Sequence, residues 1–179
     1  MFSPQNAVLF VIDVQGKLAH LVHNAPDIIE NIQKLIHAAK ILNIPIIWTE
    51  QVPDKIGTTI PEITNLLTDI KPLIKASFSC LNEKTIQKKL QSLNRDQVIV
   101  AGIETHVCVY QTVAQLIDDE FSVQVVADAV SSRTLENKQI ALNRIAVLGA
   151  DITSCEMIIT ELLQTSAHPK FKEIIQLIK

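Results

Sequence analysis

One stretch sets the pattern for the whole chain: Val98-Ile-Val-Ala-Gly-Ile-Glu-Thr-His-Val-Cys-Val-Tyr110. Its apolar run stops at Gly102, which is typical of a buried strand that ends in a turn, and a helical segment then begins with Cys108 in its first turn. Unpaired backbone N–H groups and the helix dipole favour negative charge at such a position. We therefore expect a lowered pKa for the Cys108 thiol and a nucleophilic thiolate. The alternative is that Cys108 only packs in the core, as free cysteines often do.

On both sides of this stretch, short apolar runs alternate with longer amphipathic segments. The predicted strands are residues 7–12, 44–48, 73–74, 97–101, 122–127 and 151–153. The predicted helices are residues 27–42, 60–67, 82–93, 105–119, 134–148 and 155–163, an amphipathic tail covers 169–178, and a mobile loop is expected at 53–59. Strict alternation predicts an α/β domain with helices on both faces of a parallel sheet, which is a three-layer α/β/α doubly wound fold.

The composition fits one compact domain and argues against several kinds of partner. The 179 residues are 47% hydrophobic and 4% aromatic, which suits an aliphatic core in a single domain over residues 1–179. The net charge is −3 without a basic cluster, so we expect no nucleic-acid partner. We also expect no membrane partner, because the start of the chain lacks a signal-peptide pattern and no apolar run reaches about 18 residues. The chain has three cysteines, an odd number, and their spacing is not that of a zinc site. This indicates a protein of the reducing cytoplasm rather than one held by a disulfide framework.

Three residues of different chemistry follow predicted strands. Asp13 follows the first strand, Lys75 the third and Cys108 the fourth. Ligands of open α/β sheets bind at the carboxyl ends of the strands, near the point where the strand order reverses. A carboxylate, an ammonium and a thiol in these places predict a catalytic site. Taken singly, Asp13 can cap the turn that follows it, and Lys75 can be a solvated surface lysine.

Further motifs accompany these residues. They are Phe10-Val-Ile-Asp-Val-Gln15, Lys75-Ala-Ser-Phe78, Ala101-Gly-Ile-Glu-Thr-His-Val-Cys-Val109 and Val126-Ala-Asp-Ala-Val-Ser-Ser-Arg133. In this order, and from Ala7 to about Glu161, the chain resembles the isochorismatase-like cysteine hydrolases. Within that family it looks most like the small isochorismatase-domain proteins, rather than the bacterial siderophore enzymes.

The resemblance implies a specific fold and site. The fold would be a six-stranded parallel sheet of order 3-2-1-4-5-6, in which Lys75 starts two strands, about 10 Å, away from Asp13. The site would be a triad of Asp13, Lys75 and Cys108. A cis peptide between Ile103 and Glu104 would turn the Glu104 N–H towards the substrate, and with the Cys108 N–H it would form an oxyanion hole. The resemblance also implies a homo-oligomer.

The expected reaction is hydrolysis of a C–N bond in a small amide. Asp13 would accept the proton of the Cys108 thiol, and the Lys75 ammonium would stabilise the thiolate. The thiolate would attack the carbonyl carbon, Asp13 would return the proton to the leaving amine, and water would hydrolyse the thioester. The partner is then a small-molecule substrate.

The chain departs from two branches of the family. Nicotinamidases carry an Asp-x-His pattern and a further histidine that bind a metal, whereas Trp48-Thr-Glu-Gln-Val-Pro53 contains no histidine. Glu50 alone would be a poor zinc site, so we expect neither a metal nor another cofactor. True isochorismatases lack the nucleophilic cysteine, so Cys108 argues against vinyl-ether hydrolysis.

The remaining candidates carry less weight. Trp48 and Phe78 are candidate residues for the pocket mouth, although core packing is the favoured role for Phe78. His106 would be a doubtful base for Cys108, because residues i and i+2 of a helix do not share a face. The alternative functions are hydrolysis of a small ester or vinyl ether, a binding or scaffold protein with a vestigial triad, and a flavodoxin-like nucleotide binder, which the missing phosphate loop disfavours.

Overall fold

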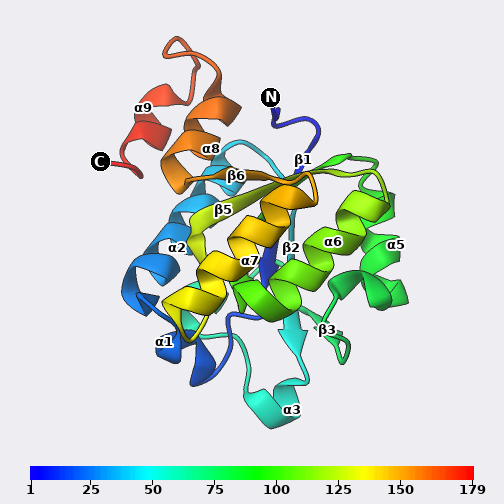
Figure 1. The fold of residues 1–179 in the computed structure, drawn as a ribbon. Coiled ribbons are helices and arrows are strands. Elements are labelled where there is room, and N and C mark those ends of the chain that lie inside the picture. The colour runs from blue at the N-terminus through cyan, green and yellow to red at the C-terminus, as the bar shows by residue number, and fades with distance from the viewer.

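The computed structural model describes residues 1–179 and contains a six-stranded parallel sheet with helices on both faces (Figure 1). The strands lie in the order β3-β2-β1-β4-β5-β6, which confirms the predicted fold class and strand order. The strands are β1 (Ala7–Ile12), β2 (Ile46–Gln51), β3 (Leu73–Lys75), β4 (Gln97–Ile103), β5 (Ser122–Ser131) and β6 (Asp151–Thr153).

The helices fill the predicted connections between these strands. They are α1 (Leu18–Leu21), α2 (Ala25–Ile41), α3 (Pro53–Ile56), α4 (Pro61–Thr64), α5 (Lys84–Ser92), α6 (Tyr110–Asp118), α7 (Leu135–Val147), α8 (Cys155–Leu163) and α9 (Phe171–Ile175). Two short turns join them, the 3-10 turn η1 (Cys80–Asn82) and the π-helical turn η2 (Thr105–Val109). None of the helices combines the length and the apolar character that crossing a bilayer requires.

The central strand β1 shows how the three layers are held together. All six of its residues are buried. Leu9 and Val11 face a core cluster shared with α2 and α8, while Phe10 and Ile12 face a second cluster shared with α5, α6 and α7. Successive side chains of a strand point to opposite faces, so a strand covered on both faces must be apolar throughout. This accounts for the uninterrupted apolar run in the sequence.

The register of the sheet brings the chemistry-bearing residues to one edge. Ile12 pairs with Thr49 of β2 and with Gly102 of β4, and Gln51 pairs with Lys75 of β3. The carboxyl ends of these four strands therefore meet on the same side of the sheet, at the point between β1 and β4 where the strand order reverses.

Two predicted boundaries were wrong in ways that affect the site. The second strand was predicted at 44–48, but β2 runs over Ile46–Gln51 because its ladder to β1 and β3 extends to Gln51. The helix predicted at 105–119 is divided into η2 and α6. Cys108 thus lies in a π-helical turn, a geometry that often occurs at functional sites.

The predicted loop at 53–59 contains the short helix α3 and is tied to the body of the protein. Thr59 forms a bridge to Gln15, and the Glu50 carboxylate accepts hydrogen bonds from the Thr59 N–H at 2.7 Å and from its hydroxyl at 2.8 Å. These contacts fix the end of the segment that follows β2.

Candidate active site

Asp13 leaves β1 in a backbone conformation that positions its carboxyl group. Its φ is 52°, in the left-handed region that aspartate tolerates better than most residues. Its N–H donates to the Thr49 carbonyl at 3.3 Å, and the Thr49 hydroxyl donates to Asp13 Oδ1 at 2.7 Å. One carboxylate oxygen is therefore held by β2, and Oδ2 has no hydrogen bond of good geometry.

Lys75 supplies the charge that faces this free oxygen. It is the last residue of β3, and its side chain is fully buried, with Nζ 2.6 Å from Asp13 Oδ2. The ammonium also donates to Gln51 Oε1 and to the carbonyls of Ser77 at 3.1 Å and Phe78 at 3.2 Å. A buried charge is tolerated when it is paired and hydrogen-bonded, and Lys75 meets both conditions.

The protonation of Lys75 follows from two opposing effects. Burial alone would lower its pKa, because the charged form loses hydration. Burial is the largest single effect, but the attraction of the Asp13 carboxylate, together with smaller contributions from Cys80 and Cys108, outweighs it, so the pKa of Lys75 is raised above its ordinary value of 10.5. Lys75 is therefore an ammonium ion at neutral pH and cannot act as a base.

Cys108 lies beside this ion pair but is not a resting thiolate. Its residue is 7% exposed, and Sγ is 3.9 Å from Gln51 Oε1. Burial, together with the nearby Asp13 carboxylate, raises the pKa of Cys108 to about 12, and Lys75 offsets only part of that shift. The expected lowering of the pKa was wrong, because the largest effect on this thiol is desolvation by burial, which disfavours the thiolate.

Two glutamines that the sequence analysis gave no role connect these groups. Gln51 Nε2 donates to the Ala76 carbonyl at 2.6 Å, which turns Oε1 towards Lys75 and Cys108. Gln15 Oε1 accepts from the Gln51 N–H at 2.6 Å, and its Nε2 donates to the Gly57 carbonyl at 2.6 Å. The sequence did contain one signal for these two residues, which is their position. Each glutamine stands at or just beyond the end of a strand, as Asp13 does.

The residues that lead into η2 are held from two sides. The peptide between Ile103 and Glu104 is cis. The Glu104 carboxylate accepts from the Arg133 N–H at 3.0 Å and from its Nε at 3.1 Å. Gly102 has a φ of 121°, and a Cβ added there would lie 2.1 Å from the Ile12 carbonyl oxygen. Only glycine lets β4 approach the end of β1 this closely.

A cavity of about 190 Å³ opens at this edge of the sheet. Its walls consist of Asp13, Gln15, Leu18, Gln51, Ile56, Phe78, Ile103, Glu104, Val107 and Cys108. Phe78 is a lining residue and is 53% exposed, so the favoured core position for it was wrong. Trp48 is not a lining residue: it is buried in the core cluster that packs on α2 and α8, whereas its neighbour Ile47 faces the layer of Cys108. The suggestion for Trp48 was wrong because β2 continues past it, so that it lies within the strand rather than at its end.

Two other candidates lie outside the cavity. Glu50 is buried and occupied by its hydrogen bonds to Thr59, and the structure contains no cluster of three His, Cys, Asp or Glu side chains that could hold a metal ion. His106 Nδ1 is 2.9 Å from the Ser132 hydroxyl and does not reach the cavity wall. Cys80 and Cys155 are buried and unpaired.

The fold and the site define the class of protein. It is a doubly wound α/β protein with a buried carboxylate, ammonium and thiol at the point where the strand order reverses. Comparison with known sequences identifies the family: the isochorismatase domain matches residues 7–157. The chain belongs to the isochorismatase family, and membership implies a hydrolase in general.

Three relatives show how far the similarity extends. The chain is 41% identical to the secreted isochorismatase effector Isc1 of Phytophthora sojae, over 98% of this chain and 86% of the relative. It is 37% identical to isochorismatase domain-containing protein 2 of Xenopus laevis, over 97% and 84%. Among solved structures, the MAR1 ribonuclease from Caenorhabditis elegans superposes with a TM-score of 0.93 at 40% identity, over 99% of this chain and 91% of that one.

Proposed function

We propose that this protein is a cysteine hydrolase that cleaves the C–N bond of a small amide through a thioester on Cys108, without a metal or other cofactor. One observation carries the proposal: Asp13 and Cys108 line the same small cavity, and the Lys75 ammonium lies against Asp13. A base, a nucleophile and a fixed positive charge within one site are the groups that nucleophilic catalysis on a carbonyl requires.

The first half of the reaction forms the thioester. Asp13 accepts the thiol proton as Cys108 Sγ bonds to the carbonyl carbon, and the carbonyl electron pair moves to oxygen. The backbone N–H groups of Glu104 and Cys108 stabilise this oxyanion. When the carbonyl re-forms, the C–N bond breaks, Asp13 returns the proton to nitrogen, and the amine or ammonia leaves.

The second half restores the enzyme. Asp13 accepts a proton from water while the water oxygen bonds to the thioester carbon, and the C–S bond then breaks. The sulfur leaves with the proton from Asp13, and the carboxylic acid product is released. Because the pKa of Cys108 is raised to about 12, its proton leaves as the bond to carbon forms rather than before.

Lys75 acts throughout by its charge. Each proton that Asp13 accepts or returns changes the negative charge shared between the carboxylate and the sulfur, and the ammonium stays 2.6 Å from Asp13 Oδ2. The other acceptors around Nζ hold it in place, so its charge is oriented before the reaction begins.

RNA is a second substrate class, suggested by the name of the nematode relative. The present chain supports it less well. Its net charge is −3, and the residues that line the cavity include Asp13 and Glu104 but no lysine, arginine or histidine. Phosphate-bearing chains are bound mainly by lysine and arginine.

Ammonia release from a library of primary amides tests the proposal, with Cys108→Ala and Cys155→Ala as a matched pair. Both thiols are buried, and burial raises the pKa of each to about 12. We expect Cys108→Ala to lose about 10³-fold or more of the activity, as removal of a nucleophile does, and Cys155→Ala to keep it. The proposal fails if Cys108→Ala retains turnover, or if the protein cleaves RNA or esters but no amide.

Two further proposals concern the protein's surroundings. Three buried thiols without a disulfide suit a reducing cytoplasm.

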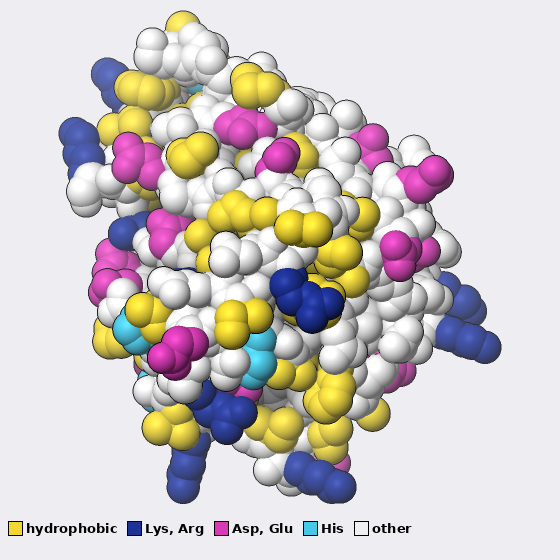
Figure 2. All heavy atoms as spheres, in the orientation of Figure 1, with side chains coloured by type: hydrophobic (Ala, Val, Ile, Leu, Met, Phe, Trp, Pro, Cys, Tyr) yellow, Lys and Arg dark blue, Asp and Glu magenta, His cyan; other side chains and the backbone are white.

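A homo-oligomer is supported by apolar side chains gathered on the face that carries α6 and α7 (Figure 2). Exposed apolar residues occur on α7, β6 and α8, namely Leu135, Ile140, Val147, Ile152 and Met157. Such patches mark association surfaces, and the molar mass from light scattering tests this proposal.

A further inference from the structure

We infer that the cavity accepts amides whose acyl group is uncharged and apolar, no larger than about a benzene ring, and that it rejects substrates carrying a carboxylate. This inference rests on the proposed function, because it names the substrate class of the same site. It is argued from the walls of the cavity, from the surroundings of Lys75 and from the segment that closes the cavity.

The walls are apolar wherever they are not part of the reacting machinery. Leu18, Ile56, Phe78, Ile103 and Val107 line the space around Cys108. The polar wall residues are two glutamines and two carboxyl residues, and none is Lys, Arg or His. Ligand sites of this kind bind the apolar body of a ligand and use a few polar groups to orient it.

The nearby cations are already engaged. The Lys75 ammonium has Asp13, Gln51 Oε1 and the carbonyls of Ser77 and Phe78 around it, which is more acceptors than its three N–H donors require. The Arg133 Nε is bound by the Glu104 carboxylate, and the side chain of Arg133 is 62% exposed outside the cavity.

A carboxylate on the substrate would therefore lose its hydration without gaining a partner. It would lie among apolar side chains and beside Asp13, whose carboxylate is already paired with Lys75. An unpaired buried charge is strongly disfavoured, and like charges add to that cost. A neutral amide meets neither penalty.

The size limit follows from the small volume of the cavity. Its volume of about 190 Å³ compares with the roughly 150 Å³ of an apolar protein cavity that holds benzene. Ile56 of α3 forms part of the wall, and the α3 segment is fixed by the Gln15–Gly57 hydrogen bond at 2.6 Å and by the Glu50–Thr59 pair. Moving the α3 segment away from the cavity would therefore break these hydrogen bonds.

Two alkylating reagents that differ only in charge test the inference without any turnover. Iodoacetamide is a small neutral amide, and iodoacetate is its anionic counterpart. With either reagent the Cys108 sulfur bonds to the CH₂ carbon, iodide leaves, and the thiol proton passes to Asp13 and then to solvent. The rates at Cys108 are read by peptide mass mapping, and the same two reagents on glutathione give the intrinsic ratio.

We expect the ratio of the iodoacetamide rate to the iodoacetate rate to be about tenfold higher or more at Cys108 than with glutathione. A tenfold change in rate corresponds to the free energy of one pKa unit. A ratio equal to that of glutathione overturns the inference. So does failure of iodoacetamide to label Cys108 faster than the buried Cys155, because a cavity for neutral amides must admit it. If the ratio is high but no amide is hydrolysed, the proposed function fails and the selectivity of the cavity stands.

A paired substitution in the wall provides the control. Ile56 is 40% exposed, so a longer side chain can be accommodated there. Ile56→Arg places a cation at the mouth and should bring the labelling ratio back towards that of glutathione. Ile56→Gln changes the polarity without adding charge and should leave the ratio high. Equal ratios in the two variants contradict an electrostatic origin.

Once an amide substrate is found, 4-methylpentanamide and succinamate make the matching pair, because both fall within the size limit and differ only in an isopropyl group against a carboxylate. We expect kcat/KM for 4-methylpentanamide to be about 100-fold higher or more. The opposite preference overturns the inference while leaving the hydrolase itself established.

Discussion

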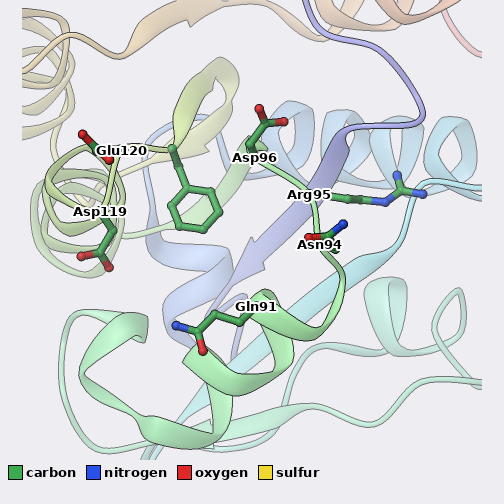
Figure 3. Close-up of a pocket in the computed structure, with 7 residues that line it drawn as sticks. Gln91, Asn94, Arg95, Asp96, Asp119 and Glu120 are labelled. Carbon is green, nitrogen blue, oxygen red and sulfur yellow. The ribbon is translucent and has the colours of Figure 1, made fainter.

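A cavity lies at each end of the sheet, and the two cavities differ in how their polar side chains are arranged. At the amino ends of the strands lies a cavity of about 480 Å³, larger than the one at Cys108 (Figure 3). It is lined by Gln91, Asn94, Arg95, Asp96, Asp119, Glu120 and Phe121. In Figure 3 the charged side chains of Arg95, Asp96 and Glu120 point away from one another. The Arg95 guanidinium instead donates to the carbonyls of Pro4 and Ala7.

At the carboxyl ends the polar groups converge and are buried. Asp13, Gln51 and Cys108 face one small space, and the fully buried Lys75 is bonded to two of them. Volume is therefore a poor guide to function in this molecule. The useful indicator is a set of buried polar groups that point at each other, because such an arrangement costs stability and needs a compensating role.

The largest expected effect is on stability, and it is tested by replacing one lysine with methionine at each end of the sheet. Lys75→Met leaves the Asp13 carboxylate buried without its cation, so we expect the free energy of unfolding to fall by about 3–5 kcal/mol and amide turnover to disappear. Lys40→Met removes an exposed pair with Asp69 near the amino ends, where solvent already screens the charges. Its unfolding by urea should match that of the unchanged protein. Equal losses in both variants would contradict the contrast.

A smaller effect is expected from the glutamine that connects the site. Gln51→Met keeps the volume but removes the oxygen that accepts from Lys75 and the amide that holds Ala76. Leaving buried partners unsatisfied costs about 1–3 kcal/mol in the free energy of unfolding. We also expect kcat to fall, with KM little changed. Gln91→Met, in the wall of the amino-end cavity, is the matched control and should leave both constants alone.

At neutral pH the smallest effect is that of the buried thiols, because their loss of stability develops only at alkaline pH. The thiols have an ordinary pKa of 9.0, but burial raises the pKa of Cys80 to about 11 and those of Cys108 and Cys155 to about 12. Above pH 9 the unfolded chain loses these protons first, so the folded state binds more protons and the free energy of unfolding falls as pH rises. The raised pKa of Lys75 acts in the same direction above 10.5.

Urea unfolding at pH 8, 9.5 and 10.5 measures this slope. Cys155→Ala removes one of the three thiols without touching the cavity, so its slope should be shallower than that of the unchanged protein. An identical slope would mean that the buried thiols do not govern the alkaline transition.

Much of the fold could be predicted because its signals are local. Apolar runs such as Ala7–Ile12 mark buried strands, and the motifs around Asp13, Lys75 and Cys108 identified the family and its strand order. The three residues also reach one place, because parallel strands share an edge.

What could not be predicted depends on contacts between distant segments. The end of β2 at Gln51 is set by pairing with β1 and β3, so neither the core position of Trp48 nor the role of Gln51 was visible. The pKa of Cys108 was misjudged for the same reason. The helix terminus is a local feature, whereas desolvation depends on every element that closes the cavity.

Gly102 has a consequence for how this enzyme could evolve or be engineered. The space between its Cα and the Ile12 carbonyl admits no further atom, and Ile12 directly precedes Asp13. Any side chain at position 102 would push β1, which leads to Asp13, away from β4, which leads to Cys108. In a saturation screen for activity, Gly102 would be as intolerant as Cys108, although it has no side chain with which to touch a substrate. The spacing of two backbones would be under selection there, and a search for new activities should vary the α3 segment instead.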